Sequence, residues 1–166
     1  MQTIYKDLPY RSNVGIMLVN DEGYVFVGQR LDNNQNAWQM PQGGIDGNEE
    51  PETAAYRELL EETGVERQNV QLIASTSKWL SYDLPEDLIP KLWDGKYRGQ
   101  KQKWFLFKLK KDVNITFEHD PDNEFDDFNW VPYWYPLSVI VSFKEEVYRE
   151  ALNKLRYSFC KEFSNV

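Results

Sequence analysis

Three glutamates, Glu58, Glu61 and Glu62, lie within five positions of the chain. If this segment is helical, their spacing of three and four residues makes them direct neighbours on the helix surface. Carboxylates gathered on one patch raise one another's pKa unless a cation joins them. Hard divalent cations such as Mg²⁺ prefer oxygen ligands and usually meet a protein through a few carboxylates together with substrate phosphates. The spacing therefore fits a cation site, although an acidic helix face is more often only solvated.

The residues around these glutamates carry the signals of a helix from about residue 49 to residue 63. Asn48 is the expected N-cap, and Pro51 would lie in the first turn, where its missing N–H costs little. Acidic residues near the start complement the positive end of the helix dipole, and Gly64 suits the left-handed position after the last turn. The side away from the three glutamates would carry Ala55, Tyr56, Leu59, Leu60 and Thr63.

The remaining chain alternates strand-like and helix-like segments. Apolar and alternating runs predict strands at 13–20, 24–30, beginning at 69, at 100–110 and at 126–133. The turn signal between the first two predicts a hairpin, and loops are expected at 31–37 and 83–99. Residues 135–163 predict a short apolar helix and then a long one, whose apolar face is Val147, Tyr148, Ala151, Leu152, Leu155 and Phe159. This order indicates one layered α/β or α+β domain over residues 1–166.

The composition excludes several classes of protein. With 41% hydrophobic and 15% aromatic residues, the chain is too apolar to be disordered, and its single cysteine, Cys160, allows no intrachain disulfide. No secretory signal and no apolar run of transmembrane length is visible, so we expect a cytoplasmic protein that does not bind membranes. The net charge of −8 disfavours a protein that coats a long tract of nucleic acid.

One basic segment stands apart from this acidic chain, and it holds Lys96, Arg98, Lys101 and Lys103. Lys101 and Lys103 alternate with glutamines, so on a strand the two lysines would share one face. An exposed hairpin that carries lysines is one interpretation. The other is a local basic surface that attracts a phosphate-rich end, and the sequence does not decide which way this face points.

Nine positions around the glutamates fit the pattern G-x5-E-x7-R-E-U-x-E-E-x-G-U, where U is a bulky aliphatic residue. They are Gly43, Glu49, Arg57, Glu58, Leu59, Glu61, Glu62, Gly64 and Val65. This is the signature of the Nudix hydrolases, and the chain resembles that family. The resemblance implies an α/β/α sandwich around a mixed β-sheet and cleavage of a nucleoside diphosphate linked to another group. It makes Glu58, Glu61 and Glu62 metal ligands, gives Arg57 and Glu49 orienting roles, and places Gly43 and Gly44 in a turn that approaches the metal or phosphate.

Segments outside this signature, which is called the Nudix box, resemble one subgroup, the bacterial RNA pyrophosphohydrolases or (di)nucleoside polyphosphate hydrolases. Among these segments are "YRSNVGIMLVN", "WLSYDLP", "GQKQKWFLFKL" and "VSFKEEVY". The resemblance implies that Glu124 is a fourth metal-binding carboxylate. It also implies a substrate-binding set of Arg11, Arg30, Tyr82, Phe143 and Lys144. Taken alone, Arg30 and Glu124 would be surface charges, and Phe143 could belong to the core.

The implied reaction depends on Mg²⁺, for which Mn²⁺ or another divalent cation could substitute. It removes pyrophosphate from the 5′-triphosphate end of RNA, a step in mRNA decay, or hydrolyses dinucleoside polyphosphates with ATP as one product. The proton acceptor could be Glu58, Glu61, Glu62 or Glu124. The alternatives are a hydrolase of modified nucleoside triphosphates and a non-catalytic nucleotide-binding domain, although a non-catalytic member would typically lack part of the glutamate set. No protein partner is indicated.

Overall fold

The computed structural model describes residues 3–30 and 37–163. Its strands are β1 (Tyr10–Val19), β2 (Val25–Arg30), β3 (Trp38–Gln39), β4 (Gln42–Gly44), β5 (Val70–Ser75), β6 (Leu80–Asp83), β7 (Gly99–Leu109) and β8 (Phe125–Val131). Its α-helices are α1 (Thr3–Lys6), α2 (Pro51–Thr63), α3 (Tyr135–Val139) and α4 (Glu145–Phe163). Short 3₁₀ helices are η1 (Arg67–Asn69), η2 (Glu86–Lys91), η3 (Trp93–Gly95) and η4 (Ser142–Lys144).

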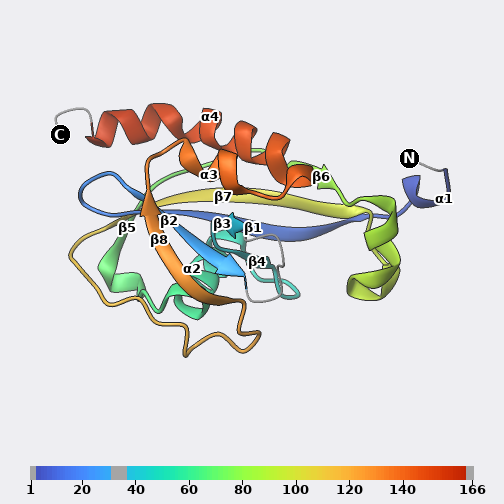
Figure 1. Cartoon of the computed structure of the whole chain (residues 1–166), viewed down its shortest axis with the longest axis horizontal. Coiled ribbons are helices and arrows are strands. Elements are labelled where there is room, and N and C mark those ends of the chain that lie inside the picture. The colour runs from blue at the N-terminus through green and yellow to red at the C-terminus, as the bar shows by residue number, and fades with distance from the viewer. Residues whose placement is uncertain (1–2, 31–36, 164–166) are drawn as a thin grey trace.

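One mixed sheet organises the molecule (Figure 1). Its central pair is β1 and β7, which run parallel from the pair Tyr10 and Gly99 to the pair Val19 and Lys108. The strand order is β3-β2-β1-β7-β5, with β8 beside β2, β6 beside β7 and β4 beside β1. Because β1 and β7 are far apart in sequence, residues from both halves of the chain meet on the same sheet surface.

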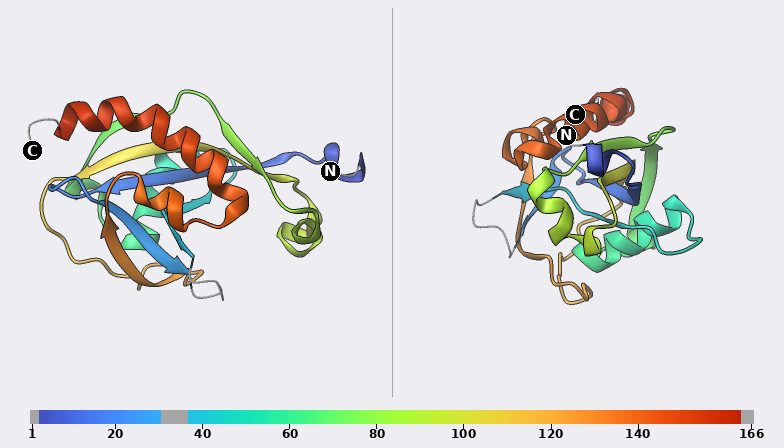
Figure 2. Two further views of the ribbon diagram at one scale, coloured as in Figure 1. Left: turned by 45° about the horizontal axis from the view of Figure 1, so that its top comes forward. Right: turned by 90° about the vertical axis from the view of Figure 1, so that its right-hand side faces the viewer.

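Two apolar clusters cover the two faces of this sheet. Helix α2 buries Ala54, Ala55 and Leu59 on one face, against β1 and β7 residues such as Val14 and Phe107. On the other face, helix α4 packs Val147, Tyr148, Ala151, Leu152 and Leu155 against the sheet, with Phe159 partly buried. The expected α/β/α sandwich around a mixed sheet is therefore confirmed, and Figure 2 shows α2 and α4 on opposite sides. Within the described ranges, no helix is sufficiently long and apolar to cross a membrane.

Helix α2 begins later than the sequence predicts, and the expectation that Asn48 caps it is wrong. The N-cap position is Glu50, whose backbone is extended (ψ 146°), and no side chain of the described residues caps the helix there. The reason is Pro51, because the residue before a proline is disfavoured from the helical region. The helix ends as expected, at Gly64 in the left-handed conformation (φ 76°), whose N–H donates to the Leu60 carbonyl.

Two other segments refine the prediction. The expected hairpin pairs β1 with β2 next to its turn, at Val19 and Val25. Along its length β2 instead pairs with β8, from Val25 opposite Val131 to Arg30 opposite Phe125. The loop expected at 83–99 lies between β6 and β7 and is folded into η2 and η3. The loop expected at 31–37 falls mainly on residues 31–36, which are outside the described residues.

The orientation of α2 gives a stability prediction. Leu59 is fully buried, whereas the next residue, Leu60, is only half-buried. We expect Leu59→Ala to lower the free energy of unfolding by about 2–5 kcal/mol, because it leaves a cavity in the core. Leu60→Ala removes the same atoms in the same helix and should lower it by less than about 1 kcal/mol. Urea denaturation measures both, and equal losses would contradict this orientation.

Candidate functional site

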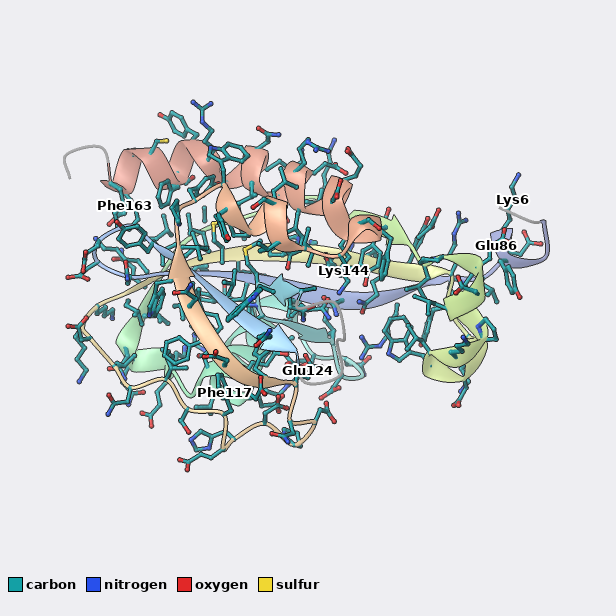
Figure 3. All side chains as sticks on the ribbon, in the orientation of Figure 1. Lys6, Glu86, Phe117, Glu124, Lys144 and Phe163 are labelled. Carbon is teal, nitrogen blue, oxygen red and sulfur yellow. The ribbon has the colours of Figure 1, made fainter. Side chains whose placement is uncertain are left out.

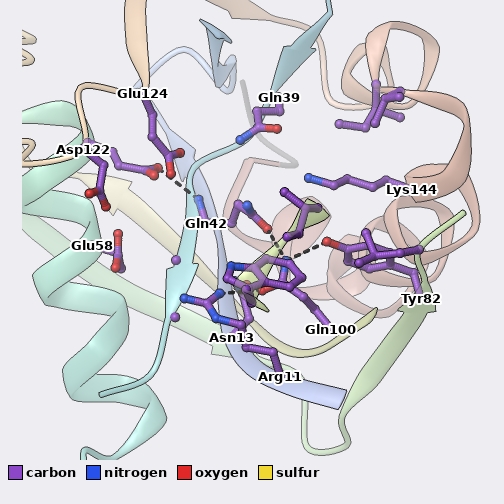
Figure 4. Close-up of a pocket in the computed structure, with 18 of the residues that line it drawn as sticks. Arg11, Asn13, Gln39, Gln42, Glu58, Tyr82, Gln100, Asp122, Glu124 and Lys144 are labelled. Carbon is purple, nitrogen blue, oxygen red and sulfur yellow. Dashed lines mark hydrogen bonds between the residues drawn. The ribbon is translucent and has the colours of Figure 1, made fainter. Parts of the chain in front are cut away.

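A cavity of about 860 Å³ opens at one end of the sheet, between α2 and the start of α4. Its walls come from β1, β4, α2, β6 and β7, from the loop before β8, and from the segment that leads into α4. Figure 3 shows Glu124 and Lys144 on elements at opposite sides of this region. In the close-up, carboxylates line one side of the cavity, and Lys144 and Tyr82 lie on the other (Figure 4).

The carboxylate wall is built from the helix glutamates. Glu58, Glu61 and Glu62 all line the cavity, which confirms that the helix brings them together. They do not form a solvated face, because Glu58 is 8% exposed and Glu62 only 2%. Helical spacing in the sequence predicts that all three glutamates lie opposite the apolar side of the helix. In the structure, however, Glu58 and Glu62 lie at the border of the buried face. They are thus held at the edge of the core, where negative charge is poorly solvated.

Arg57 ties the helix to the preceding loop. Its guanidinium donates to both carboxylate oxygens of Glu49, at 3.0 and 2.9 Å, and to the Gly44 carbonyl at 2.8 Å. It also donates to Glu58 at 2.9 Å and to Glu61 at 3.3 Å. One side chain therefore sets the orientation of both glutamates, in agreement with the orienting roles expected of Arg57 and Glu49.

The two glycines of the box allow this close approach. A Cβ atom on Gly43 would lie 1.9 Å from the Glu58 carboxyl carbon, and one on Gly44 would lie 2.1 Å from an Arg11 nitrogen. Next to them, the backbone N–H of Gln42 donates to Glu62 at 3.0 Å. Strand β4 thus lies directly against the carboxylates and against Arg11, because positions 43 and 44 carry no side chain.

Glu124 enters the same cavity from the loop before β8. Its buried Oε2 atom accepts no hydrogen bond from any described residue. The loop is shaped by Asp120, whose carboxylate accepts the N–H groups of Asp122 at 2.9 Å and of Glu124 at 2.8 Å. Asp120 and Asp122 also line the cavity, although the sequence pattern did not single them out. Their only signal was a dense acidic run before β8, which is also typical of a surface loop.

Burial dominates the acid–base properties of this wall. It raises the pKa of Glu58 to about 8, with Glu61 adding to the effect and Arg57 opposing it. Burial and then the nearby charge of Glu124 raise the pKa of Glu62 well above its usual range. The pKa of Glu61 is also raised by burial, although Arg57 opposes the shift. In contrast, the hydrogen bonds from Arg57 lower the pKa of Glu49. The wall is thus short of positive charge.

This wall fits the donor chemistry of a hard divalent cation. It offers carboxylate oxygens, one of them buried without a partner among the described residues. Among those residues no three acidic, histidine or cysteine side chains already converge as a complete metal site. An open set of carboxylates is what Mg²⁺ uses when substrate phosphates and water complete its coordination. The residues that could hold such a cation are Glu58, Glu61, Glu62 and Glu124.

The facing wall is aromatic and cationic. Tyr82, Phe143 and Lys144 all line the cavity, so the structure brings these three residues of the predicted substrate-binding set together, and their role in binding stays a prediction. The rings of Tyr82 and Phe143 lie 5.9 Å apart, and the Lys144 ammonium lies 5.7 Å from the centre of the Tyr82 ring. Phe143 also packs against the core cluster that contains α4, so the same side chain both lines the cavity and belongs to the edge of the core. Lys144 is 7% exposed, which makes its charge a strong partner for an anion that enters the cavity.

The floor is a network of polar side chains, of which Asn13 and Gln100 could not be identified from the sequence. Arg11 donates to the Gln100 side chain at 2.7 Å, and Asn13 donates to the same oxygen at 2.8 Å. The Gln100 amide in turn donates to the Tyr82 hydroxyl at 2.6 Å. These residues come from β1, β6 and β7, so only the parallel pairing of β1 with β7 reveals the network. It places Arg11 in the cavity, as expected.

Two other expectations have different outcomes. Arg30 is the last residue of β2, and its side chain lies outside the part of the chain that the structure describes. The four basic residues of the segment at 96–103 are all described, and none of them lines this cavity, although Gln100 between them does. Arg98 pairs with Asp83 instead, at 3.1 Å. Lys101 and Lys103 lie over the Trp79 ring, at 4.8 and 5.1 Å from its centre.

Known proteins similar to this chain include a whole family and close relatives within it. The family model described as NUDIX domain matches residues 9–151. The RNA pyrophosphohydrolase of Roseobacter denitrificans is 53% identical over 149 residues, which cover 88% of this chain and 91% of that protein. The protein of the same name from Pseudomonas fluorescens strain SBW25 is 50% identical over 147 residues, with the same coverage of 88% and 91%.

Solved structures share the fold at low sequence identity. The E. coli dihydroneopterin triphosphate pyrophosphohydrolase superposes with a TM-score of 0.68 at 18% identity, covering 88% of this chain and 99% of that one. The C. elegans Ap4A hydrolase, in a binary complex, gives a TM-score of 0.64 at 17% identity, with coverage of 89% and 98%. At these identities the likeness concerns the arrangement of the sheet and helices.

The raised pKa values predict how stability depends on pH. The pKa of Glu58 is about 8 in the folded protein, against an ordinary value of 4.5, so the folded state holds the proton more tightly. Without a divalent cation, the melting temperature should therefore fall as pH rises from about 5 to about 8. A change of about 1 kcal/mol corresponds to roughly 2–4 °C for a domain of this size.

Two controls test this interpretation in calorimetry. Glu58→Gln cannot ionise, so it should weaken this pH dependence, and the remainder would come from Glu61 and Glu62. Added Mg²⁺ should raise the melting temperature more at pH 8 than at pH 5, because it binds the ionised carboxylates. An unchanged pH dependence in the variant would show that Glu58 does not carry the effect.

The hydrogen bonds of Asp120 give a second prediction. We expect Asp120→Ala to speed amide hydrogen exchange of Asp122 and Glu124 by roughly fivefold or more, because each amide loses a partner worth about 1 kcal/mol. Asp126→Ala removes an exposed carboxylate two residues after Glu124 and should leave both amides unchanged. Exchange measured by NMR distinguishes the variants, and equal rates in all three proteins would remove this role from Asp120.

Proposed function

The chain belongs to the Nudix hydrolase family, and we propose that it removes pyrophosphate from the 5′-triphosphate end of RNA. Hydrolysis of dinucleoside polyphosphates is the second activity that the same site would support. Relatives about half identical over most of the chain are named RNA pyrophosphohydrolase, which supports the first reaction. We also propose that residues 1–166 form one Nudix domain, which acts in the cytoplasm in mRNA decay.

One observation carries this proposal: a single cavity has carboxylates on one wall and Lys144 with two aromatic rings on the other. A nucleotide with a polyphosphate has two matching parts. Its base stacks on aromatic rings, and its phosphates need both cationic side chains and a cation held by carboxylates. The volume of about 860 Å³ is within the range of nucleotide-sized ligand sites.

Glu58, Glu61, Glu62 and Glu124 would hold Mg²⁺, with Mn²⁺ or another divalent cation as a substitute. When bound, the cation would offset the charge of the phosphates, make a water more acidic and stabilise the leaving pyrophosphate. The support is the fit described above: buried carboxylates with raised pKa values and a buried Glu124 oxygen that lacks a partner among the described residues.

The protein's own groups would divide the remaining work. Arg57, fixed by Glu49, would hold Glu58 and Glu61 in place through its hydrogen bonds. Lys144 and Arg11 would bind phosphate oxygens, and we assign Arg30 to the same role on the resemblance alone. Phe143 and Tyr82 would hold the first base. Water adds to phosphorus, the bridging P–O bond to the leaving pyrophosphate breaks, and one of the four glutamates accepts the proton of the water.

A direct test compares substrates and one variant. We expect Glu61→Gln to lower kcat by about a hundredfold or more on 5′-triphosphate RNA, because it removes a carboxylate from the reacting site. Glu66→Gln changes an exposed glutamate just after the helix and should have little effect. Chromatography of the released pyrophosphate, with a parallel melting curve for each variant, gives the measurement.

The same assay decides between the two substrates. Wild-type protein is offered 5′-triphosphate RNA and diadenosine tetraphosphate at equal Mg²⁺, and kcat/KM is determined for each. A large preference for the RNA supports the proposal, and a large preference for the dinucleotide replaces it with the second activity. Full activity of Glu61→Gln on both substrates would overturn the assignment of the metal-binding wall.

A further inference from the structure

Arg98, Lys101 and Lys103, which do not line the larger cavity, lie over the rings of Tyr10 and Trp79, and these rings line a second, smaller cavity of about 390 Å³. Residues of β1 and of the segment from β4 to α2 form part of it, and its aromatic members are Tyr10, Trp79 and Tyr97. Arg11 lines both this cavity and the larger one, so the two adjoin at that residue. We define the track surface as Trp79, Lys101, Lys103, Tyr97 and Tyr10.

We infer that the track surface binds single-stranded RNA downstream of the 5′ end, over the few nucleotides that follow those held in the larger cavity. The inference rests on the proposed function, and it adds to that function a site for the body of the substrate. Such a site would contact a short stretch of chain, which agrees with the expectation that no long tract is bound.

The chemistry of the track surface matches that of a single strand. Both lysine ammonium groups lie close to one indole ring, at 4.8 and 5.1 Å from its centre, and Trp79 is still 38% exposed. Proteins bind single strands without sequence preference by stacking bases on aromatic rings beside a groove of basic side chains. The triad of Lys101, Trp79 and Lys103 provides both elements side by side.

An aromatic connection joins the triad's neighbourhood to the larger cavity. The Arg11 guanidinium lies 4.9 Å from the centre of the Trp93 ring, which lines the larger cavity. Trp93 in turn makes an edge contact with Tyr97, at 6.2 Å between ring centres, and Tyr97 lines the second cavity. A strand that leaves the larger cavity past Arg11 would therefore meet rings before it reaches the lysines.

Two acidic groups near this path, Asp83 and Glu49, are already paired. Asp83 forms an ion pair with Arg98 at 3.1 Å and accepts the Tyr10 hydroxyl at 2.7 Å. Glu49, which lines the second cavity, is paired with Arg57 at 2.9 Å. In contrast, the charges of Lys101 and Lys103 face an aromatic ring rather than a carboxylate. On a chain of net charge −8, the track surface is therefore a local site at which phosphates are attracted.

The test uses substrates of different length. We expect the double variant Lys101→Gln, Lys103→Gln to lower kcat/KM on a twelve-nucleotide 5′-triphosphate RNA by about tenfold, and Trp79→Leu by about fivefold or more. Both variants should keep wild-type kcat/KM on a 5′-triphosphate dinucleotide and on diadenosine tetraphosphate, which are too short to reach the triad. With the long substrate, log kcat/KM should fall with log salt concentration less steeply in the lysine variant. The slope should become smaller by about 0.7 for each phosphate that no longer has a lysine beside it.

A matched control distinguishes the loss of the track surface from the change in the net charge of the protein. Lys110→Gln, Lys111→Gln removes the same charge just after the other end of β7, where neither lysine lines either of the two cavities, and should leave kcat/KM on the long substrate unchanged. Equal losses on long and short substrates, or no loss on the long one, would overturn the inference. No loss on the long RNA would leave the surface to a protein partner.

Binding distinguishes this inference from the proposed function. A fluorescent twelve-nucleotide 5′-monophosphate RNA is titrated with wild-type and variant protein, and anisotropy gives Kd. Failure to hydrolyse 5′-triphosphate RNA, with wild-type binding about tenfold tighter than that of the lysine variant, would reject the reaction and keep the track surface. Hydrolysis with equal binding by both proteins would keep the reaction and reject the track surface.

Discussion

The organisation of this protein depends on negative charge held where water is scarce. Glu58 and Glu62 are almost fully buried beside Glu61 and Glu124, an arrangement that is unfavourable without positive charge. Arg57 compensates for part of it and is itself held by Glu49 and by the Gly44 carbonyl. The remaining deficit of positive charge is what makes this wall suited to a divalent cation. The buried carboxylates that the proposed reaction needs therefore lower the stability of the metal-free protein, whereas a bound cation would remove this cost.

The sheet separates two tasks. One face of β1 and β7 packs under α2 and fixes the helix that carries the glutamates. The alternate residues of the same strands, Arg11, Asn13 and Gln100, form the polar floor of the cavity. Because side chains alternate along a strand, two neighbouring strands suffice to support the metal wall and to line the substrate site.

The sequence was informative wherever the spacing of residues along one element was enough. The glutamate pattern, the end of the helix at Gly64 and the apolar face of the last helix could all be predicted from local periodicity. Asn48 was mispredicted because the restriction that Pro51 imposes on Glu50 outweighed its capping preference. Asp120, Asn13 and Gln100 could not be found, because their roles depend on a loop conformation and on a strand pairing between distant segments. The side of the sheet on which Lys101 lies was undecidable for the same reason.

The parallel pairing of β1 with β7 also has a consequence for the order in which the molecule is made. Arg11 and Gln100, which touch in the folded protein, are 89 positions apart. Helix α2 leaves the ribosome before β7, β8 and Glu124 exist, so its carboxylates can meet Arg57 and strand β4 early, whereas Glu124 joins them much later. Contacts of such long range make folding slow. A nascent chain therefore carries the acidic helix for some time without Glu124 and without the β7 side of the site, so a cation bound at that stage would have only the helix glutamates as its carboxylate ligands.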